Sequence, residues 1–370
     1  MLRGLCPSQH SALSTQHFPK GGSELATATQ TLKKAVPAPR ASGGDNVLKE
    51  MWKHRGDYMY VLPALIVMGI VILYPLIKVI WLSFHFTSPY GGAEQFVGLD
   101  NYKEAVQDEH FGIVIRNTIV WTFASTVLAL FLGLAAAILL ARPIRFRGFF
   151  RSALFIPYVI GQVTAAFVWK WIFHADFGVI SGLLVQTGII DKPIKFIDST
   201  SLVLPSLIVV NVWKEFPFAM IMLLAGLQAI PEQLYNAAKI DGAGRWRRFT
   251  DITIPQLMPV ITVASILLII ANVNAFTIVW ILTGGGPAYR SQIFITHVYS
   301  QAFVGSPHFE LASALGVMIF LALMVFAIFY VRLLTRQGHS HRADEGEDEV
   351  LVAGQGVAIA GTAGGSGVTE

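Results

Sequence analysis

Charged side chains are scarce in this sequence. Asp, Glu, Lys and Arg together make up 14% of the 370 residues, whereas soluble proteins carry about 25%. The hydrophobic fraction is 54%, and much of it is gathered into runs of about 20 residues, the length that crosses a bilayer. The scarcity of charge therefore excludes an ordinary soluble domain and indicates a protein that crosses the membrane several times.

Several chemical devices are also missing. Cys6 is the single cysteine, which excludes an internal disulfide, and no apolar run precedes it as in a lipoprotein or secretory signal. No Cys/His cluster has the spacing of a metal site. No Gly-x-x-x-x-Gly-Lys-[Ser/Thr] phosphate loop is present, so we expect no ATP hydrolysis and no cofactor in this chain. The formal net charge of +4 comes from basic loops and does not indicate nucleic-acid binding.

The apolar runs predict an all-α integral membrane protein with six transmembrane helices. Pro75 is expected to kink the first of them, and Lys78 to extend toward the membrane surface. A short half-buried helix is expected at 178–184. The predicted spans are 58–84, 118–141, 152–173, 202–227, 260–282 and 311–334.

The two ends of the chain differ in composition from this six-span domain, which we place at 51–337. Residues 1–50 are rich in Ser, Thr, Gly, Pro and Ala, and residues 338–370 hold an acidic run followed by Gly, Ala and Val. Such segments bury too little apolar surface to fold, so we expect a disordered tail at each end. A start assigned too early is an alternative for the first tail, because Met51 directly precedes the first span.

Basic residues are distributed unequally between the two sides of the predicted membrane. The segments 142–151 and 228–259 and the end of the last span are rich in arginine, whereas the opposite loops hold fewer Lys and Arg. Basic loops stay in the cytoplasm. We therefore predict a multi-pass protein of a bacterial or archaeal inner or plasma membrane, surrounded by lipid, with both termini cytoplasmic.

The segment 236–259 is the long basic interruption of the apolar second half. Asp241-Gly242-Ala243-Gly244 predicts a turn, because glycine adopts backbone angles that other residues avoid. Apolar residues at helical spacing on both sides predict two short amphipathic helices, and Pro255 and Pro259 mark the start of the next span. Loop backbone cannot lie in lipid, so the unit is expected at the cytoplasmic face. A plain solvated loop is the alternative.

This interruption resembles the EAA loop of ATP-binding-cassette (ABC) importer permeases. That pattern is Glu-Ala-Ala, three residues, Gly, nine residues, Ile, one residue, Leu and Pro; here Asn236 replaces the Glu and Ile254 replaces the Leu. The resemblance implies that residues 231–259 couple this chain to an ATPase. The implied coupling residues are Asn236, Ala237, Ala238, Asp241, Gly242, Ala243, Arg245, Phe249, Ile252 and Pro255.

The fourth predicted span contains polar residues that a bilayer disfavours. Asn211, Lys214, Glu215 and Phe218 recur at i, i+3, i+4 and i+7 and would share one helical stripe. A charge near the bilayer centre costs ~3 kcal/mol or more. Two interpretations stay open: Lys214 and Glu215 pair with each other and stabilise packing, or they line a solute path.

The fifth predicted span carries amides beside aromatic rings. Asn272, Phe276 and Trp280 recur at i, i+4 and i+8, with Asn274 nearby. Amides suit the hydroxyls of a sugar and rings suit its apolar face, while helix–helix hydrogen bonding is the alternative. We expect this stripe to face that of the fourth span across a water-filled cavity.

Four segments, 96–102, 211–218, 226–259 and 282–287, are similar to sugar permeases of the maltose-transporter type. The resemblance implies a type I importer permease for an oligosaccharide, disaccharide or related polyol. It also implies a second homologous permease subunit, two ATP-binding subunits that carry ATP-Mg, and an extracellular or periplasmic solute-binding protein. The matching site positions are Asn211, Lys214, Glu215, Phe218 and Asn272.

Two other classes of membrane protein are alternatives to this interpretation. An ion-coupled secondary transporter of a small polar solute would need an acidic relay, and Glu215 is the one acid deep in a predicted span. A membrane enzyme would need a catalytic constellation, whereas His174, His297 and His308 have no matched nucleophile and base. We therefore predict no catalytic residue and no enzyme.

Overall fold

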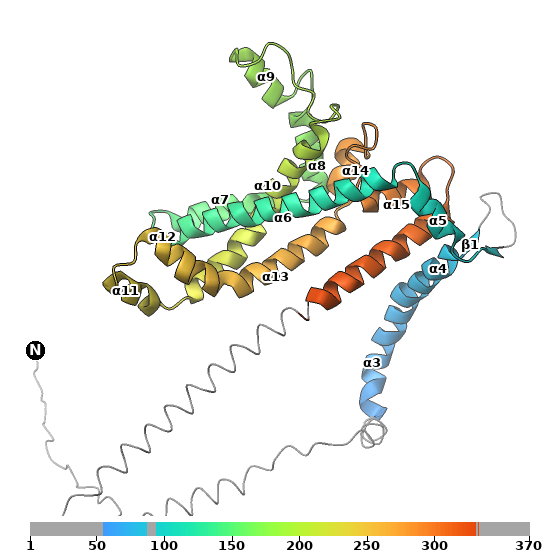
Figure 1. Ribbon diagram of the computed structural model, residues 1–370, viewed down its shortest axis with the longest axis horizontal. Helices are drawn as coiled ribbons and strands as arrows, with labels where there is room; N and C mark the ends of the chain where they lie inside the picture. Colours follow the sequence, from blue (N-terminus) through green and yellow to red (C-terminus); the bar gives the residue numbers. More distant parts are fainter. Residues whose placement is uncertain (1–54, 87–93, 331, 333–370) are drawn as a thin grey trace, which may run out of the picture. The chain divides into compact units, whose positions relative to one another are not determined.

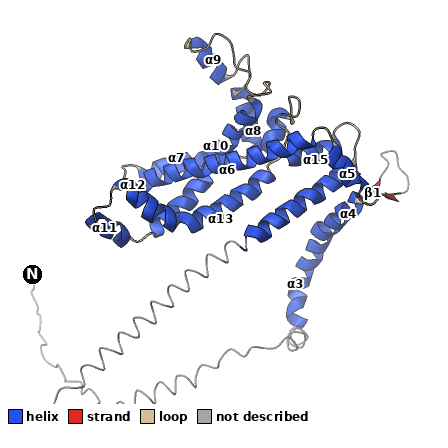
Figure 2. Ribbon diagram, viewed as in Figure 1, coloured by secondary structure: helices blue, strands red, loops and turns tan. Residues whose placement is uncertain are grey.

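The computed structural model describes residues 55–86, 94–330 and 332. The predicted tails at 1–50 and 338–370, and with them the outer limits of the 51–337 domain, lie outside the described residues. The chain divides into two structural units, residues Met1–Ile72 and Leu73–Glu370. Helix dominates the described residues of both (Figure 2).

The described part of the first unit is helical. Helix α3 covers Arg55–Met68 with Pro63 inside it, and a π-helical turn, η2 (Gly69–Leu73), begins where α3 ends. Helix α4 (Tyr74–Ser83) follows in the second unit and carries Pro75 in its first turn. A proline cannot donate a backbone hydrogen bond, and a π-helical turn is a rare single-turn interruption of an α-helix. The kink predicted at Pro75 stays a prediction; the structure has a π-helical turn directly before α4 and counts Met59–Ser83 as one span.

A small polar structure follows α4 in the second unit. Strands β1 (His85–Phe86) and β2 (Gln95–Phe96) pair antiparallel, and α5 (Asp100–Gln107) follows. The Asn101 side chain holds the start of α5 by donating to the backbone oxygens of Ser83 at 3.0 Å and His85 at 3.1 Å. These two-residue strands leave the predicted all-α class unchanged.

Helices α6 (Phe111–Ala141) and α10 (Val203–Ala229) form the centre of the second unit. They pack along each other (Figure 1), and α13 (Ile254–Val273) packs on both. Helix α6 begins seven residues before the predicted start at residue 118 because Asn117 is fully accommodated: its Nδ2 donates to the backbone oxygens of Tyr289 and Gln292 at 2.9 and 3.1 Å. A polar residue in this position therefore does not end the helix.

The third predicted span is wrong as a single helix. It consists of α7 (Arg147–Val159) and α8 (Gln162–Ile172), which bend by 93° at their junction. Ile160 and Gly161 are extended at the junction, so the helical hydrogen-bond ladder stops there. Helix α9 (Val179–Gln186) confirms the short half-buried helix expected near residues 178–184.

The fifth predicted span is displaced along the chain. After α11 (Glu232–Ile240), the helix that enters the membrane begins at Arg245 and runs through α12 (Arg245–Arg248), the π-helical turn η3 (Phe249–Thr253) and α13 to Val273. Pro255 lies in the first turn of α13, and Pro259 inside it. A separate helix, α14 (Thr277–Thr283), follows the break after α13, so the continuous span predicted for 260–282 is wrong.

The remaining described helices are α15 (Phe294–Phe303) and the helix Phe309–Tyr330. By length and apolar composition, five described helices are able to cross a membrane: Met59–Ser83, Phe111–Ala141, Val203–Ala229, Arg245–Val273 and Phe309–Tyr330. The bent pair α7–α8 makes a sixth if it is one span. The predicted number of six is met on that count.

Candidate functional site

A buried amide in α13 joins three of the membrane-spanning helices. Asn272 is completely buried; its Oδ1 accepts a hydrogen bond from Asn211 Nδ2 of α10 at 2.6 Å. Its Nδ2 donates to Glu215 Oε2 at 3.0 Å and lies 3.3 Å from Thr126 Oγ1 of α6. Its backbone oxygen accepts from Trp121 Nε1 at 3.0 Å. The predicted polar residues of spans four and five are therefore brought together.

This contact corrects the expected arrangement of the two stripes. Asn211 and Asn272 bond to each other directly, so no water-filled cavity separates them at this level. Direct interhelical hydrogen bonds between amides are a stabilising contact within membranes. The helix–helix alternative holds for this pair of residues.

Lys214 does not bind Glu215, its neighbour in sequence, but backbone oxygens at the end of α7. Its Nζ donates to the backbone oxygen of Ile160 at 2.6 Å and lies 3.2 and 3.4 Å from those of Tyr158 and Pro157. These carbonyls lie at the end of α7, where a helix leaves its last C=O groups without helical partners. Within the described residues, Lys214 and Glu215 form no direct ion pair, so the mutual pairing considered above is wrong.

The predicted stripe of α10 is thus divided between two neighbours. Asn211 and Glu215 face α13, whereas Lys214 and Phe218 face α7: the Phe218 ring stacks on Tyr158 with centroids 5.9 Å apart. Lys214 Nζ also lies 5.8 Å from the centroid of the Tyr158 ring. Residues at i, i+3 and i+4 are close on a helix surface, but they need not share a partner.

The aromatic residues of the predicted fifth span form a separate group. Phe276 and Trp280 stack with centroids 5.5 Å apart, and Tyr299 of α15 lies 4.8 and 4.7 Å from them. The break before α14 removes Asn272 from their helical face, so the predicted i, i+4, i+8 alignment is wrong. Asn274 lies in the break, is exposed, and donates to the backbone oxygen of Ile270 at 2.8 Å.

The ring group borders an open cavity with charged residues. Trp280 lines a cavity of about 650 Å³ together with Lys170 and Asp198. Rings beside polar groups are the surroundings that a sugar prefers. This arrangement differs from the expected one, because the polar partners come from α8 and the segment before α10.

Sequence reasoning missed several members of these groups, namely Trp121, Thr126, Tyr158 and Tyr299. A signal for Thr126 was present: Thr122, Ser125 and Thr126 follow at i, i+3 and i+4 in an apolar span, and all three are buried. No pattern in the sequence indicates Tyr299, which comes from a helix outside the predicted spans.

The turn predicted at Gly242 in the basic segment 236–259 is present in the structure. Gly242 has a φ of +76°, and its N–H donates to Lys239 O at 3.2 Å while the Ala243 N–H donates to Ala238 O at 2.8 Å. This pair of bonds is the Schellman motif that ends helices at a left-handed residue. The predicted helix–turn–helix is confirmed, with the difference that its second helix continues into the membrane-spanning α13.

The helix–turn–helix leaves apolar side chains in water. Helix α11 has no buried residue, and the exposed fractions of Ile240 and Trp246 are 87% and 76%. Asn236 accepts a hydrogen bond from Lys239 Nζ at 3.1 Å, so it keeps a local polar contact in place of the family's Glu. Tyr235 faces inward and its hydroxyl lies 3.0 Å from Thr253 Oγ1.

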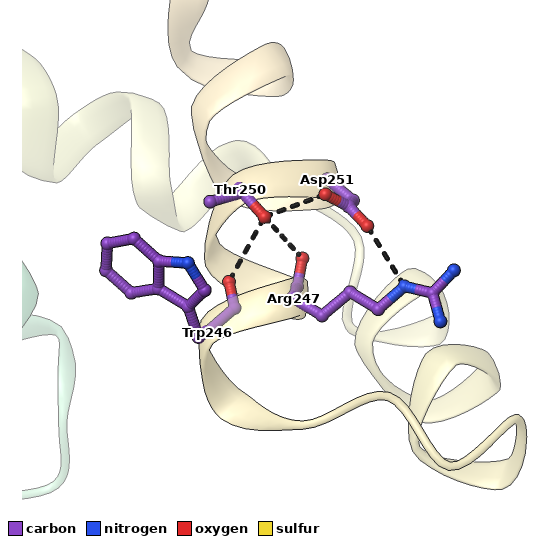
Figure 3. A network of polar contacts seen from close by, with 4 residues as sticks. All are labelled: Trp246, Arg247, Thr250 and Asp251. Carbon is purple, nitrogen blue, oxygen red and sulfur yellow. Dashed lines mark hydrogen bonds and ion pairs between the residues drawn. The ribbon is translucent and has the colours of Figure 1, made fainter.

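A polar network orders the first turn after the glycines (Figure 3). Arg247 Nε donates to Asp251 Oδ2 at 3.3 Å, and Thr250 Oγ1 lies 2.7 Å from Asp251 Oδ1. Thr250 Oγ1 also lies 3.3 Å from the backbone oxygen of Trp246 and 3.2 Å from that of Arg247. The network neutralises Arg247 and aims it away from Trp246. Across the described residues, no group of three or more His, Cys, Asp or Glu side chains could hold a metal ion.

Comparisons with known proteins agree on one family. The sequence model of the protein family described as "Binding-protein-dependent transport system inner membrane component" matches residues 129–338. The chain is 32% identical over 292 residues to the trehalose/maltose transport system permease protein MalF of Thermococcus litoralis, covering 78% of this chain and 98% of that protein. It is 32% identical over 291 residues to the trehalose transport system permease protein SugA of Mycobacterium tuberculosis, covering 76% and 90%.

A solved structure has the same fold. It is a chain of a bacterial ABC transporter involved in the import of the acidic polysaccharide alginate, with a TM-score of 0.67 over 79% of this chain and 99% of that one. The two sequences are 22% identical, so this likeness concerns the fold alone.

Proposed function

The chain belongs to the family of binding-protein-dependent transport system inner membrane components, and we propose that it is a permease subunit of an ATP-driven importer for a disaccharide, a short oligosaccharide or a related polyol. Members of this family are membrane-embedded permease components, so the chain is not an enzyme, and ATP hydrolysis is the work of a partner. The proposed solute class rests on the relatives named for trehalose and maltose.

The observation that carries the coupling proposal is the exposed helix–turn–helix of residues 231–259. It presents Ile240 and Trp246 to water beside several positive charges. Exposed apolar residues rimmed by polar ones mark a protein interaction site. The proposed contacts to the ATPase are Asn236, Ala237, Ala238, Asp241, Gly242, Ala243, Arg245, Phe249, Ile252 and Pro255.

The residues of the proposed solute path fall into two groups that differ in exposure. Glu215, Phe218, Phe276 and Trp280 are half-buried and Asn274 is exposed, so they are the proposed solute contacts. The buried residues Asn211, Lys214 and Asn272 hold the walls of the path by fixing α10 to α7 and α13.

The proposed assembly contains further subunits. A second homologous permease completes the path, two ATP-binding subunits carry ATP-Mg, and an extracellular or periplasmic solute-binding protein delivers the solute. The arginines that follow α6 and those in the middle of the segment 231–259 support a cytoplasmic position for the coupling face and both termini, in an inner or plasma membrane. An ion-coupled secondary transporter remains the alternative function.

Uptake measurements separate the two functions. Cells lacking this gene, with and without a plasmid copy, receive labelled trehalose, maltose and longer glucosides. We expect uptake that needs the plasmid copy, stops when ATP is depleted by arsenate, and survives a protonophore while ATP is maintained. Uptake that survives ATP depletion and collapses with the protonophore would instead support the ion-coupled transporter.

Coupling is tested at Gly242, whose left-handed conformation costs a β-branched residue roughly 1–2 kcal/mol. No atom lies within 4 Å of a Cβ built at this glycine, so a substitution strains the backbone without a clash. We expect Gly242→Val to insert normally but to lose uptake and co-purification of the ATPase, and Gly242→Asn, which tolerates this conformation, to keep both. Normal uptake by Gly242→Val would contradict the docking role.

A further inference from the structure

A basic cavity lies where two membrane-spanning helices end beside the helix–turn–helix. Its volume is about 760 Å³, and its walls come from the ends of α6 and α10 together with α11, α12 and η3. The side chains that give it its character are Arg142, Arg245, Arg248, Tyr235, Trp246 and Phe249.

The positive charge of this cavity is uncompensated. The residues that line it, all within the described part of the chain, include no Asp or Glu. None of the three arginines forms an ion pair with a described residue, and Arg248 Nε is buried without a hydrogen-bond partner there. Arg247 makes the contrast, since it lies one residue away and pairs with Asp251 (Figure 3). A buried guanidinium atom without a partner needs an anion or water.

The other wall of the cavity is apolar. Ile138 and Leu227 come from the last turns of α6 and α10, which end at Ala141 and Ala229. The cavity therefore spans the boundary between hydrocarbon and water. Trp246, 76% exposed at its rim, is the residue type that gathers at this boundary.

We propose that this cavity binds an anionic phospholipid, with Arg142 and Arg248 on the headgroup phosphate and the apolar wall against the glycerol and the first acyl carbons. Guanidinium groups bind phosphate in a bidentate manner, and basic pockets between membrane helices hold anionic headgroups. A free phosphate would form the same bonds with the guanidinium groups, but it would leave the apolar wall of the cavity in contact with water. Because the same cavity touches α11 and α12, the bound lipid stabilises the proposed coupling face against the spans.

The test uses the purified, delipidated full chain in a neutral detergent. Retention of phosphatidylglycerol is measured by native mass spectrometry, and its affinity by the rise in melting temperature on titration, with phosphatidylcholine and inorganic phosphate as separate arms. Arg142→Gln with Arg248→Gln removes two cavity charges. Arg145→Gln with Arg247→Gln removes two charges outside the cavity, and both variants leave the proposed ATPase contacts Arg245 and Phe249 intact.

We expect wild type and the control variant to retain phosphatidylglycerol, and the cavity variant to bind it about 5-fold more weakly for each arginine removed. Arg142 is exposed, so Arg142→Gln alone should fold normally and show one such step. Equal stabilisation by inorganic phosphate would make a soluble anion the ligand and overturn the lipid assignment. Wild-type binding by Arg142→Gln and the double variant, or equal loss in the control, would overturn the site.

Discussion

Single buried polar side chains hold the spans of this permease in place. Lys214 donates hydrogen bonds to backbone oxygens at the end of α7 that have no helical partner because the helix breaks at Ile160. A buried polar group without a hydrogen-bond partner destabilises the fold by about 1–3 kcal/mol. Glu215 needs only to present an oxygen to Asn272 Nδ2, which an amide also does. We therefore expect the protein to tolerate substitution of Glu215 by an amide better than substitution of Lys214 by an apolar residue.

Substitution separates these roles. We expect Lys214→Met to lower the free energy of unfolding by about 1–3 kcal/mol and Glu215→Gln to change it by less than about 0.5 kcal/mol. Melting of the purified protein in detergent measures both. Recovery of Lys214→Met stability on adding Glu215→Gln would mean that the two side chains do interact directly, against the geometry found here.

His297 of α15, outside the membrane-spanning helices, couples stability to pH. The residue is 2% exposed and burial lowers its pKa below the ordinary 6.5, with Asp108 opposing this shift and His110 adding to it. Below pH 6.5 the unfolded chain then binds more protons than the folded one, so stability is complete above that pH and is lost as the pH falls.

We expect the melting temperature to fall as the pH drops below about 6.5, and to fall less in His297→Gln. Glu104, Asp108 and His308 line the same cavity and are present in both proteins, so the difference between the two profiles isolates His297. Superimposable profiles would show that another group controls the acid sensitivity.

Helix pairs depend on small residues at their crossings. Ala129, Gly133 and Ala137 follow at intervals of four in α6, and both alanines are completely buried. A Cβ built at Gly133 lies 2.6 Å from Ala219 Cβ and 2.8 Å from the backbone nitrogen of Met220. Small residues at such spacing let two membrane helices approach closely, so α6 and α10 contact each other backbone to backbone here.

The crossing predicts a position-dependent glycine effect. Gly133→Ala should lower the free energy of unfolding by about 1–3 kcal/mol through overpacking. Gly112, at the other end of the same helix, has no atom within 4 Å of a built Cβ, and Gly112→Ala should be neutral or stabilising by up to about 1 kcal/mol. Equal melting temperatures for the two variants would contradict the close crossing.

Orientation in the membrane is a property of the whole molecule. In the second unit, α5 and α9 lie in loops on the side opposite to the helix–turn–helix in the predicted topology. Gln107, Gln186 and Gln233 are exposed in α5, α9 and α11, so each accepts a cysteine without a packing change. The single natural cysteine, Cys6, is first replaced by serine.

With an impermeant thiol reagent on intact cells, cysteines at Gln107 and Gln186 should be labelled and one at Gln233 should not. The Gln233 variant should react once the cells are opened, which controls for access. Labelling of Gln233 from outside would reverse the orientation that the arginine distribution favours.

The class of this protein and its local motifs follow from the amino-acid sequence alone. Backbone groups in lipid must be satisfied within the segment, so long apolar runs have the helix as their solution. Spans one and four and the start of span six were placed within a few residues. The turn at Gly242 was equally local, because one left-handed residue sets it. The spacing around that turn carried the family resemblance.

Contacts between residues of different helices became known from the packing of the helices. Helical periodicity states which side chains share a face but not which neighbour that face contacts, so Lys214 could not be assigned to the carbonyls at Ile160, nor Asn272 to Asn211. The break between α7 and α8 and the end of α13 at Val273 were missed for the same reason. A break in an apolar helix costs little free energy when a side chain hydrogen-bonds to the carbonyls that the break leaves free. Here that side chain is far away in sequence, so the sequence pattern does not reveal it.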